Sequence, residues 1–383
     1  MAQTTVSMLN QGIAPLAPLI QTEYALSRAQ VGLLSLALGL GSYLTVAASG
    51  RLIDRLGERG MMLASGLIAG ALSAAMLASH SFLSTEILVV IMGAGVAVST
   101  PAGSKAVMGW FDVRIRGTAM GIRQVGIPLG GMVASLILPP LALVVGWRGA
   151  LTVAGGVAIA GSVLCWSLYR DPPAIAAAKG GLPPVVSFGS ILRNRNLWLI
   201  SLYSIAMISA QFTFSLYLVV FATEGLGQSV VGAGTLLALA QGVAVGARIA
   251  WGVVSDRVFS GDRRPAMAII ALLAGFSSIG FSFMHSGVAL WIVALAVIVL
   301  GASAIGWNGL YVTAISEVAG QASAGTALGL SLAVSQLGVL IVPPLFGLLA
   351  DRTGSYQPAW IALGVFVLVG TLPIYKVARH AGG

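Results

Sequence analysis

Residues 50–55, Gly-Arg-Leu-Ile-Asp-Arg, end one long apolar run, and residues 252–257, Gly-Val-Val-Ser-Asp-Arg, end another one 202 residues later. A second pair of stretches agrees, because Gly-Thr-Ala-Met-Gly at 117–121 returns as Gly-Thr-Ala-Leu-Gly at 325–329, an offset of 208 residues. Two related offsets of this size predict a chain built from two duplicated halves. Duplicated hydrophobic halves are typical of membrane proteins that rock around a central site.

The composition predicts that lipid is the solvent of this chain. Hydrophobic residues make up 57% and charged residues 8%, against roughly 45–50% and about 25% in an ordinary soluble domain. The one cysteine, Cys165, lies in an apolar run, which rules out an intramolecular disulfide and a cysteine metal cluster. The three histidines are far apart and lie beside no carboxylate pair, so we expect no metal and no cofactor.

Runs of about 20 apolar residues predict an all-α membrane protein with twelve transmembrane helices in two six-helix bundles. The predicted spans lie near 2–20, 30–49, 60–79, 87–109, 117–142, 148–168, 196–221, 230–253, 265–284, 288–315, 325–349 and 359–378. Pro139-Pro140 and Pro343-Pro344 interrupt two of these runs, so each pair is expected to kink its helix or end it early. The polar, turn-rich stretch 170–195 predicts a cytoplasmic linker between bundles 1–169 and 196–383.

The distribution of basic residues predicts the orientation. With the amino terminus inside, the outer loops hold only Arg28, Arg148 and Arg352. The inner segments hold Arg51, Arg55, Arg59, Arg114, Arg116, Arg170, Lys179, Arg193, Arg195, Arg257, Arg263, Arg264, Lys376 and Arg379. This bias predicts a multi-pass protein of a bacterial inner (plasma) membrane with both termini in the cytoplasm. The net charge of +9 is therefore a topology signal. We expect a lipid bilayer as partner, no nucleic acid, and a monomer.

Residues 50–59, Gly-Arg-Leu-Ile-Asp-Arg-Leu-Gly-Glu-Arg, match the signature that the major facilitator superfamily carries between its second and third helices. The chain resembles that superfamily over essentially its whole length, and residues 252–257 resemble a degenerate second copy. The stretch 126–131, Gly-Ile-Pro-Leu-Gly-Gly, resembles the fifth-helix element often associated with exchangers. The resemblance implies two bundles related by a pseudo-two-fold axis along the membrane normal, and transport by alternating access.

The Gly–Asp–Arg signature predicts a conformational latch. Gly50 allows neighbouring helices to approach closely, and Asp54 can accept hydrogen bonds from the amino end of an adjacent helix or pair with arginines across the cytoplasmic face. Such a latch would hold the outward-open state and release in the inward-open one. The residues expected to act in gating are Gly50, Asp54, Arg55, Arg59, Gly252, Asp256, Arg257, Gly126 and Pro128.

The charges inside the predicted spans indicate an anionic substrate. Lys105, Arg123 and Arg248 are the only basic residues within apolar runs, whereas every acidic residue falls in a loop or at a predicted helix end. An uncompensated buried charge costs several kcal/mol, and a substrate anion is the natural compensation. Lys105 could instead snorkel to the inner surface, and Arg123 could be interfacial. Arg248 could also have a purely structural role.

Residues 247–252, Ala-Arg-Ile-Ala-Trp-Gly, resemble the eighth-helix segment of monocarboxylate porters and of the oxalate–formate exchanger. In those families the arginine, here Arg248, meets the substrate carboxylate. Nitrate/nitrite porters also use an eighth-helix arginine, but with a partner arginine at the symmetric second-helix position, where this chain has Val46. The resemblance therefore favours a small organic anion.

Neutral polar and aromatic side chains complete the predicted pathway. Gln3, Ser7, Asn10 and Gln11 follow helical spacing on the first span and should face the bundle interior. Hydrogen bonding between packed helices and lining of the pathway both explain such residues. The residues expected to contact substrate are Arg248, Lys105, Arg123, Asn10, Gln11, Tyr203, Gln211, Gln241, Trp307, Asn308 and Gln336.

Other functions remain open at this point. Drug efflux by proton exchange is favoured by the fifth-span element but opposed by the missing deep carboxylate. A non-transporting receptor or sensor would usually add a soluble domain. An enzyme would need a constellation of His, Asp or Glu inside the spans, and an ATP-driven pump would need a Gly-x4-Gly-Lys-Ser/Thr loop. A proton could travel on the substrate or on an interfacial group such as Glu317, or anions could exchange.

Overall fold

The computed structural model describes residues 2–97, 99–111, 116–170, 188–320 and 323–378. Within these ranges the side chains of 46–56, 100–101, 105, 108–109, 116–118, 121, 188 and 190 lie outside the description. The described residues form helices joined by short turns. The helices are α1 (Ala2–Gln11), α2 (Ile13–Tyr24), α3 (Arg28–Ala75), η1 (Met76–Ala78), α4 (Phe82–Ala97), α5 (Ser99–Trp110), α6 (Arg116–Leu168), α7 (Phe188–Leu192), α8 (Arg195–Glu224), α9 (Val230–Arg257), α10 (Arg263–Phe281), α11 (Leu290–Leu300), η2 (Gly301–Ile305), α12 (Asn308–Ala319), α13 (Ala324–Thr353) and α14 (Gln357–Tyr375).

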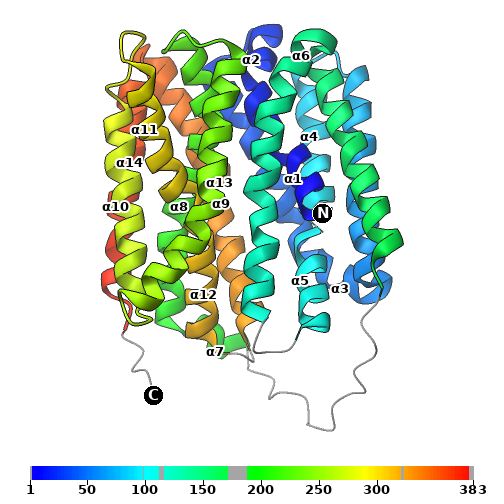
Figure 1. Ribbon diagram of the computed structural model, residues 1–383, viewed down its shortest axis with the longest axis vertical. Helices are drawn as coiled ribbons and strands as arrows, with labels where there is room; N and C mark the ends of the chain where they lie inside the picture. Colours follow the sequence, from blue (N-terminus) through cyan, green and yellow to red (C-terminus); the bar gives the residue numbers. More distant parts are fainter. Residues whose placement is uncertain (1, 98, 112–115, 171–187, 321–322, 379–383) are drawn as a thin grey trace.

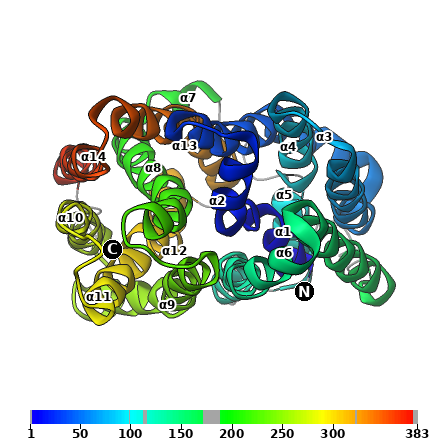
Figure 2. The same cartoon turned by 90° about the horizontal axis from the view of Figure 1, so that it is seen from above.

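The long helices run side by side along the longest axis of the molecule (Figure 1). Seen from above, α3–α6 lie on one side and α8–α14 on the other, with α1 and α2 near the middle (Figure 2). We call the amino-terminal group, α1–α6, the N half and α8–α14 the C half. The end at which α9 meets α10 is called the inner end, because the basic residues predict that it faces the cytoplasm. The opposite end, where α2 meets α3, is called the outer end.

Nine helical segments in the described part of the chain are long and apolar enough to cross a membrane. One of them, 122–168, contains a non-helical residue, Gly146 (φ 74°), at which α6 divides into two arms. Gly57 (φ 70°) divides α3 in the same way. The all-helical membrane fold is therefore confirmed, whereas the number of twelve spans stays a prediction.

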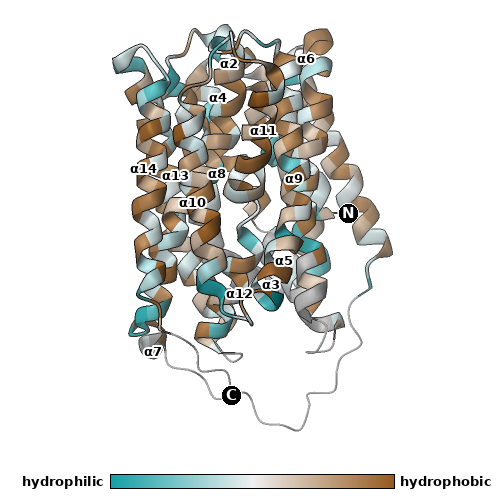
Figure 3. Ribbon diagram, turned by 60° about the vertical axis from the view of Figure 1, so that its left-hand side comes forward, coloured by the Kyte–Doolittle hydropathy of each residue, from teal (hydrophilic) through white to brown (hydrophobic). Residues whose placement is uncertain are grey.

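The outward faces of these helices carry side chains that suit lipid. Val144 is 82% exposed, Trp291 70% and Phe276 62%, whereas Leu34, Phe281 and Trp360 are fully enclosed. Apolar colouring covers much of the helices in Figure 3, while hydrophilic residues gather toward the ends. Exposing such an apolar surface to water would cost free energy, whereas contact with the hydrocarbon of a bilayer does not.

The backbone repeats between the two halves. The angle φ is positive at Ala25 and Gly227, at Gly57 and Gly261, and at Gly146 and Gly354. The members of these pairs are 202, 204 and 208 residues apart, which agrees with the offsets between the repeated sequence stretches. The side chains of Ser27 and Ser229 both cap the helix that follows. The predicted duplication is thus visible as recurring turns and caps.

The helix boundaries differ from the simplest expectation in two places. Neither pair of adjacent prolines ends its helix early, because α6 continues through Pro139-Pro140 and α13 through Pro343-Pro344; a kink at each pair stays a prediction. Ending a helix at that depth would leave backbone groups without partners in lipid, whereas neighbouring helices can satisfy the groups that a proline frees. The predicted linker 170–195 also contains a short helix, α7, and Asn194 caps the start of α8. Residues 171–187 lie outside the described ranges, so the bundle boundaries stay a prediction.

Candidate functional site

Arg248 lies deep in α9, on the seam between the two halves. It is nine residues from the inner end of that helix, a rise of about 14 Å, and it is 7% exposed. Its Nη1 donates a hydrogen bond of 2.8 Å to the backbone carbonyl oxygen of Gln124 in α6. This position excludes snorkelling to the surface and anchors one corner of the guanidinium to the N half.

The other edge of the Arg248 guanidinium has no partner in the part of the chain that the structure describes. Its Nε and Nη2 are both buried, and no described residue accepts a hydrogen bond from either atom. These two nitrogens are adjacent, and their N–H bonds point the same way, which is the fork that a carboxylate fits with both oxygens. A buried donor left without an acceptor costs about 1–3 kcal/mol, and more when it is charged. An acceptor placed against this edge, best an anion, would remove that cost.

The seam that holds Arg248 is formed by α6 and α9 running antiparallel. At one contact Arg248 meets Gln124, and seven residues away along each helix Gln241 meets Gly131, where an added Cβ would lie 2.8 Å from Gln241 Cδ. Between these contacts α9 reads Gly-Val-Ala-Val-Gly-Ala at 242–247. The small residues let the helices approach closely between the two polar contacts.

Gln241 joins the halves in the same seam. It is 1% exposed, and its Nε2 donates to Gln11 Oε1 of α1 at 3.1 Å. The Nε2 of Gln11 in turn donates to the carbonyl oxygen of Ile127 in α6 at 3.3 Å. Gln3 also points inward, because its Oε1 accepts from Arg123 Nη2 of α6 at 2.8 Å. The polar stripe of the first span therefore faces protein and not lipid, as the sequence predicts. Asn10 is half-buried and has no side-chain hydrogen bond to a described residue.

Arg123 belongs to a different environment. Its Nη2 donates to Gln3 Oε1 at 2.8 Å and its Nη1 donates to Ser104 Oγ at 3.1 Å, both within the N half. These neutral partners hold the guanidinium between α1, α5 and α6. These hydrogen bonds of Arg123 go to α1 and α5, whereas that of Arg248 goes to the backbone of α6. The backbone of Lys105 lies in α5, but its side chain is outside the described part of the chain.

The polar residues of the C half form a separate cluster. Gln211 Oε1 accepts from Trp307 Nε1 at 2.9 Å and from Asn308 Nδ2 at 3.4 Å. The π-helical turn Gly301–Ile305 precedes these two residues and interrupts the regular helix just before them. Tyr203 points away from the seam, since its hydroxyl donates to Met267 O in α10. Gln336 is half-buried on α13. The structure brings Gln211, Trp307 and Asn308 together; the Tyr203 ring lies edge-on to Trp307, with 6.2 Å between ring centroids, while its hydroxyl turns to α10.

The comparison with known families agrees with this architecture. The model of the Major Facilitator Superfamily matches residues 1–343. The chain belongs to the major facilitator superfamily. A transporter of that superfamily from Mycobacterium tuberculosis, itself uncharacterised, is 31% identical over 368 residues, covering 96% of this chain and 80% of that protein.

Further relatives carry functional names. A probable L-galactonate transporter of Escherichia coli is 24% identical and covers 94% of this chain and 83% of its own length. A membrane sensor protein of Salmonella typhimurium is 27% identical and covers 92% of this chain and 85% of its own length. A solved bacterial homologue of the human lysosomal transporter Spinster, in an inward-facing and unoccupied conformation, matches with a TM-score of 0.81 at 17% identity, covering 100% of this chain and 97% of that one. This last likeness shows the fold. The chain is a multi-pass membrane transporter and not an enzyme.

The signature residues of this transporter lie at the inner end. Arg263 of α10 pairs with Asp256 at the end of α9 and, at 2.8 Å, with Glu317 of α12. The aspartate of the second signature copy therefore helps to join three helices of the C half. In the first copy Arg59 donates to Trp166 O at 2.7 Å and its guanidinium lies 4.5 Å from the Trp166 ring. Both contacts stay inside one half.

The other predicted gating residues are placed as follows. Arg257 is exposed, and a Cβ added at Gly252 would meet nothing, so close helix approach does not explain that glycine. Gly126 packs against α1, where an added Cβ would lie 3.0 Å from Thr4 Oγ1. Pro128 is buried inside α6. The side chains of Gly50, Asp54 and Arg55 lie outside the described residues, so the proposed latch at Asp54 stays a prediction.

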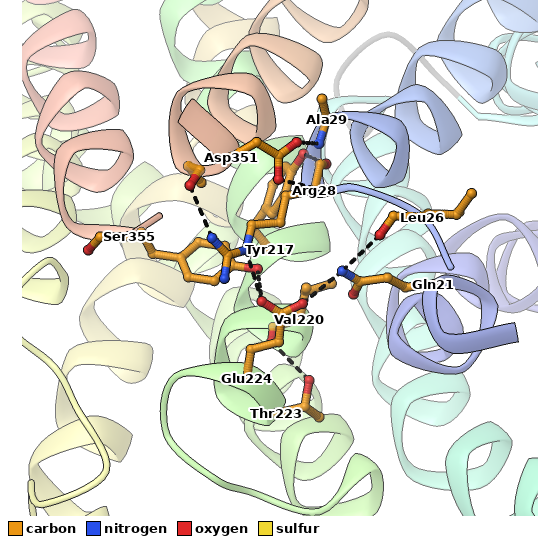
Figure 4. A network of polar contacts seen from close by, with 12 residues as sticks. Gln21, Leu26, Arg28, Ala29, Tyr217, Val220, Thr223, Glu224, Asp351 and Ser355 are labelled. Atoms are coloured by element: carbon orange, nitrogen blue, oxygen red, sulfur yellow. Dashed lines mark hydrogen bonds and ion pairs between the residues drawn. The ribbon is translucent and has the colours of Figure 1, made fainter. Parts of the chain in front are cut away.

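A polar network at the outer end that joins the halves was not foreseen from the sequence. At the outer end, Arg28 pairs with Glu224 at 2.9 Å and Asp351 accepts from the backbone N–H groups of Arg28 and Ala29 (Figure 4). Gln21 also donates to Glu224 at 2.7 Å, and Tyr217 donates to Arg28 O. α2 and α3 are thereby fastened to α8 and α13, which closes the outer end. Sequence reasoning placed these charges in loops without partners, because the pairing crosses about 200 to 320 residues of chain.

One expectation about acidic residues also needs amendment. Glu86 lies inside α4, in its second turn, and its Oε1 is buried without a hydrogen-bond partner among the described residues. The predicted span began one residue later, so the sequence placed this carboxyl at a helix boundary. It lies toward the outer end of α4 and contributes nothing to the Arg248 seam.

Proposed function

We propose that this transporter moves a small organic anion with a carboxylate group across a bacterial inner membrane by alternating access. The observation that carries the proposal is the unpartnered Nε and Nη2 edge of Arg248, buried on the seam between the halves. A carboxylate would supply both missing acceptors and the missing negative charge at once. The name of one relative, a probable L-galactonate transporter, supports the same class of substrate, because galactonate is an organic anion.

Alternating access explains why the edge is buried here. In this structure α6 closes over α9 at Arg248, and the outer end is held shut by Arg28, Glu224 and Asp351. A movement of one half against the other would open the α6–α9 seam and expose the edge to an incoming anion. The substrate would then stabilise the states in which it contacts Arg248, which is the differential binding that transport requires.

The topology and the oligomeric state that we propose rest on the sequence patterns described above. We infer twelve transmembrane helices in two bundles, 1–169 and 196–383, both termini in the cytoplasm, and a monomer as the working unit. Coupling could use a proton carried with the substrate or exchange for a second anion. Uptake measured with and without an imposed pH gradient distinguishes these two mechanisms.

Uptake into proteoliposomes tests the proposal. We expect the wild-type protein to accumulate labelled carboxylates, and Arg248→Ala to lose nearly all uptake because the charge and fork are gone. Arg352→Ala is the matched control, since that arginine is exposed at the end of α13, and it should keep wild-type uptake. Uptake unchanged in Arg248→Ala, in protein that is folded and correctly inserted, would overturn the proposal.

A sensor is the second candidate, favoured by the relative named as a membrane sensor protein. A sensor would bind the anion through Arg248 but would not move it across the membrane. Saturable binding in detergent together with no uptake in proteoliposomes would therefore favour the sensor. No contact of the described residues favours drug efflux.

A further inference from the structure

The hydrogen-bond chain from Ile127 to Gln241 fixes which way the Gln241 amide faces. The carbonyl oxygen of Ile127 can only accept, so the group of Gln11 that faces it must be the NH2 group. The Oε1 of Gln11 then faces Gln241, and the group of Gln241 that meets it must be its own NH2 group. The Oε1 of Gln241 is therefore the remaining atom, and reversing either amide would place two acceptors or two donors against each other.

This Gln241 Oε1 is a buried acceptor without a donor. The Gln241 side chain is 1% exposed, and its Oε1 has no hydrogen-bond partner in the described part of the protein. A second unpartnered acceptor, Gln124 Oε1, lies on the residue whose carbonyl oxygen anchors Arg248. Among the described residues of the α6–α9 seam, two donors of Arg248 thus have no acceptor, and the side-chain oxygens of the two glutamines have no donor.

Spacing along α9 sets how far apart a ligand must present these groups. Gln241 and Arg248 are seven residues apart, so they lie on the same face of the helix with a rise of about 10 Å between their Cα atoms. Ala244 and Val245 lie between them on that face; Ala244 is fully buried and Val245 is half-buried. A ligand that meets both side chains needs a donor well separated from its carboxylate.

From these atoms we infer that the substrate is a hydroxylated carboxylate, and that Gln241 selects it by accepting a hydrogen bond from a hydroxyl group remote from the carboxylate. The inference rests on the proposed function, because it takes the carboxylate at Arg248 as given. It assigns to Gln241 a specificity role that an acid without hydroxyl groups cannot use.

Other second groups on the ligand fit these acceptors less well. A second carboxylate or a sulfonate would bring a negative group against the Gln241 carbonyl oxygen, which repels it. An ammonium would donate, but it would need a buried counter-charge once the ligand carboxylate has paired with Arg248. No described carboxylate pairs with Arg248 or Gln241. A neutral hydroxyl is satisfied by one acceptor.

Binding of matched acids to the purified full-length transporter in detergent tests this inference. The probes are straight-chain acids from propionate to hexanoate, each paired with its hydroxylated counterpart from lactate to gluconate. We expect the longer hydroxylated acids to bind at least ten times more tightly than their unsubstituted counterparts, because the latter leave Gln241 Oε1 without a donor. Gln241→Met should erase this preference by weakening only the hydroxylated acids.

Thr371→Val is the matched control. It removes a buried polar group, whose hydroxyl donates to Val367 O within α14, outside the α6–α9 seam, so the preference should persist. If wild-type protein binds both members of every pair equally, or if Thr371→Val loses the preference just as Gln241→Met does, the inference is overturned. The wild-type comparison alone decides the matter if Gln241→Met does not fold.

The outcome separates this inference from the proposed function. Equal binding of all these acids that still depends on Arg248 would remove the hydroxyl requirement and keep the carboxylate transporter. Binding that does not depend on Arg248, or binding of neither series, would remove both.

Discussion

The Arg28 Nε atom lies 2.9 Å from Glu224 Oε2, and this ion pair ties the start of α3 in the N half to the end of α8 in the C half. Asp351 strengthens the same junction, because its two oxygens accept from the first two backbone N–H groups of α3 at 3.0 and 2.8 Å. A carboxylate at a helix amino terminus is stabilised by the exposed N–H groups and by the helix dipole. One half thus caps a helix of the other half, and only while the outer end is closed.

Weakening this outer junction should shift the transporter toward the outward-open state. Asp351→Asn removes the charge that faces the amino end of α3, and Glu224→Gln removes the partner of Arg28. Each contact is worth roughly 0.5–1.5 kcal/mol, so we expect the ratio of outward-open to closed molecules to rise about two- to tenfold. Distances between spin labels on the outer ends of the halves measure this ratio.

A control for the outer junction is available at the inner end. Arg264 pairs with Asp262 at 2.6 Å within the C half, so Arg264→Gln should leave the distribution of outer-end distances unchanged. Outer-end distances that stay at their wild-type values in Asp351→Asn and Glu224→Gln would show that the junction does not hold the closed state.

Arg248 should lower the stability of the substrate-free protein. Its Nε and Nη2 are buried and have no hydrogen-bond partner among the described residues, so replacement by an apolar side chain of similar length removes a cost. We expect Arg248→Met to melt at the same or a higher temperature than the wild type while losing anion binding. A structural role would have the opposite signature, namely a clear loss of thermal stability in Arg248→Met.

Close contact between α3 and α4 should make the stability of the protein sensitive to replacing one glycine of α3. A Cβ added at Gly41 would lie 1.8 Å from Val90 O of α4, a backbone atom that cannot move without shifting the helix. We expect Gly41→Ala to destabilise the protein by about 1–3 kcal/mol, as overpacking generally does. Gly156→Ala is the control, because a Cβ there meets nothing within 4 Å. Thermal melting in detergent compares them, and equal melting temperatures would contradict this packing.

The sequence predicts the fold well because local sequence patterns largely determine this fold. Long apolar runs, the repeat near residues 50–55 and 252–257, and the polar stripe of the first span are all periodic or repeated features. The structure confirms an all-helical membrane protein and places Gln11 in the interior. The prolines do not end their helices early, because ending a helix in lipid would leave backbone groups without partners.

The site was only partly predictable, because its contacts join residues far apart in the chain. Hydropathy identifies Arg248 as a buried cation, but only the three-dimensional contact with Gln124 shows which edge stays unpartnered. Tyr203 is an aromatic residue of the kind that often lines a binding site. Its hydroxyl donates to Met267 O in α10, and the sequence of α8 alone does not predict that contact. The outer junction of Arg28, Glu224 and Asp351 was missed for the same reason.

Binding of an acid and of its neutral primary amide to wild type, Arg248→Lys and Arg248→Met tests the central claim most directly. Losing a charge-assisted contact in a dry site costs on the order of 2–5 kcal/mol, or about 30- to several-thousand-fold in affinity. We predict that the wild type prefers the acid by such a factor. Arg248→Lys should keep part of the preference, because it offers a point charge without the fork, and Arg248→Met should keep none. A folded Arg248→Met protein that still prefers the acid as strongly as the wild type would contradict the account.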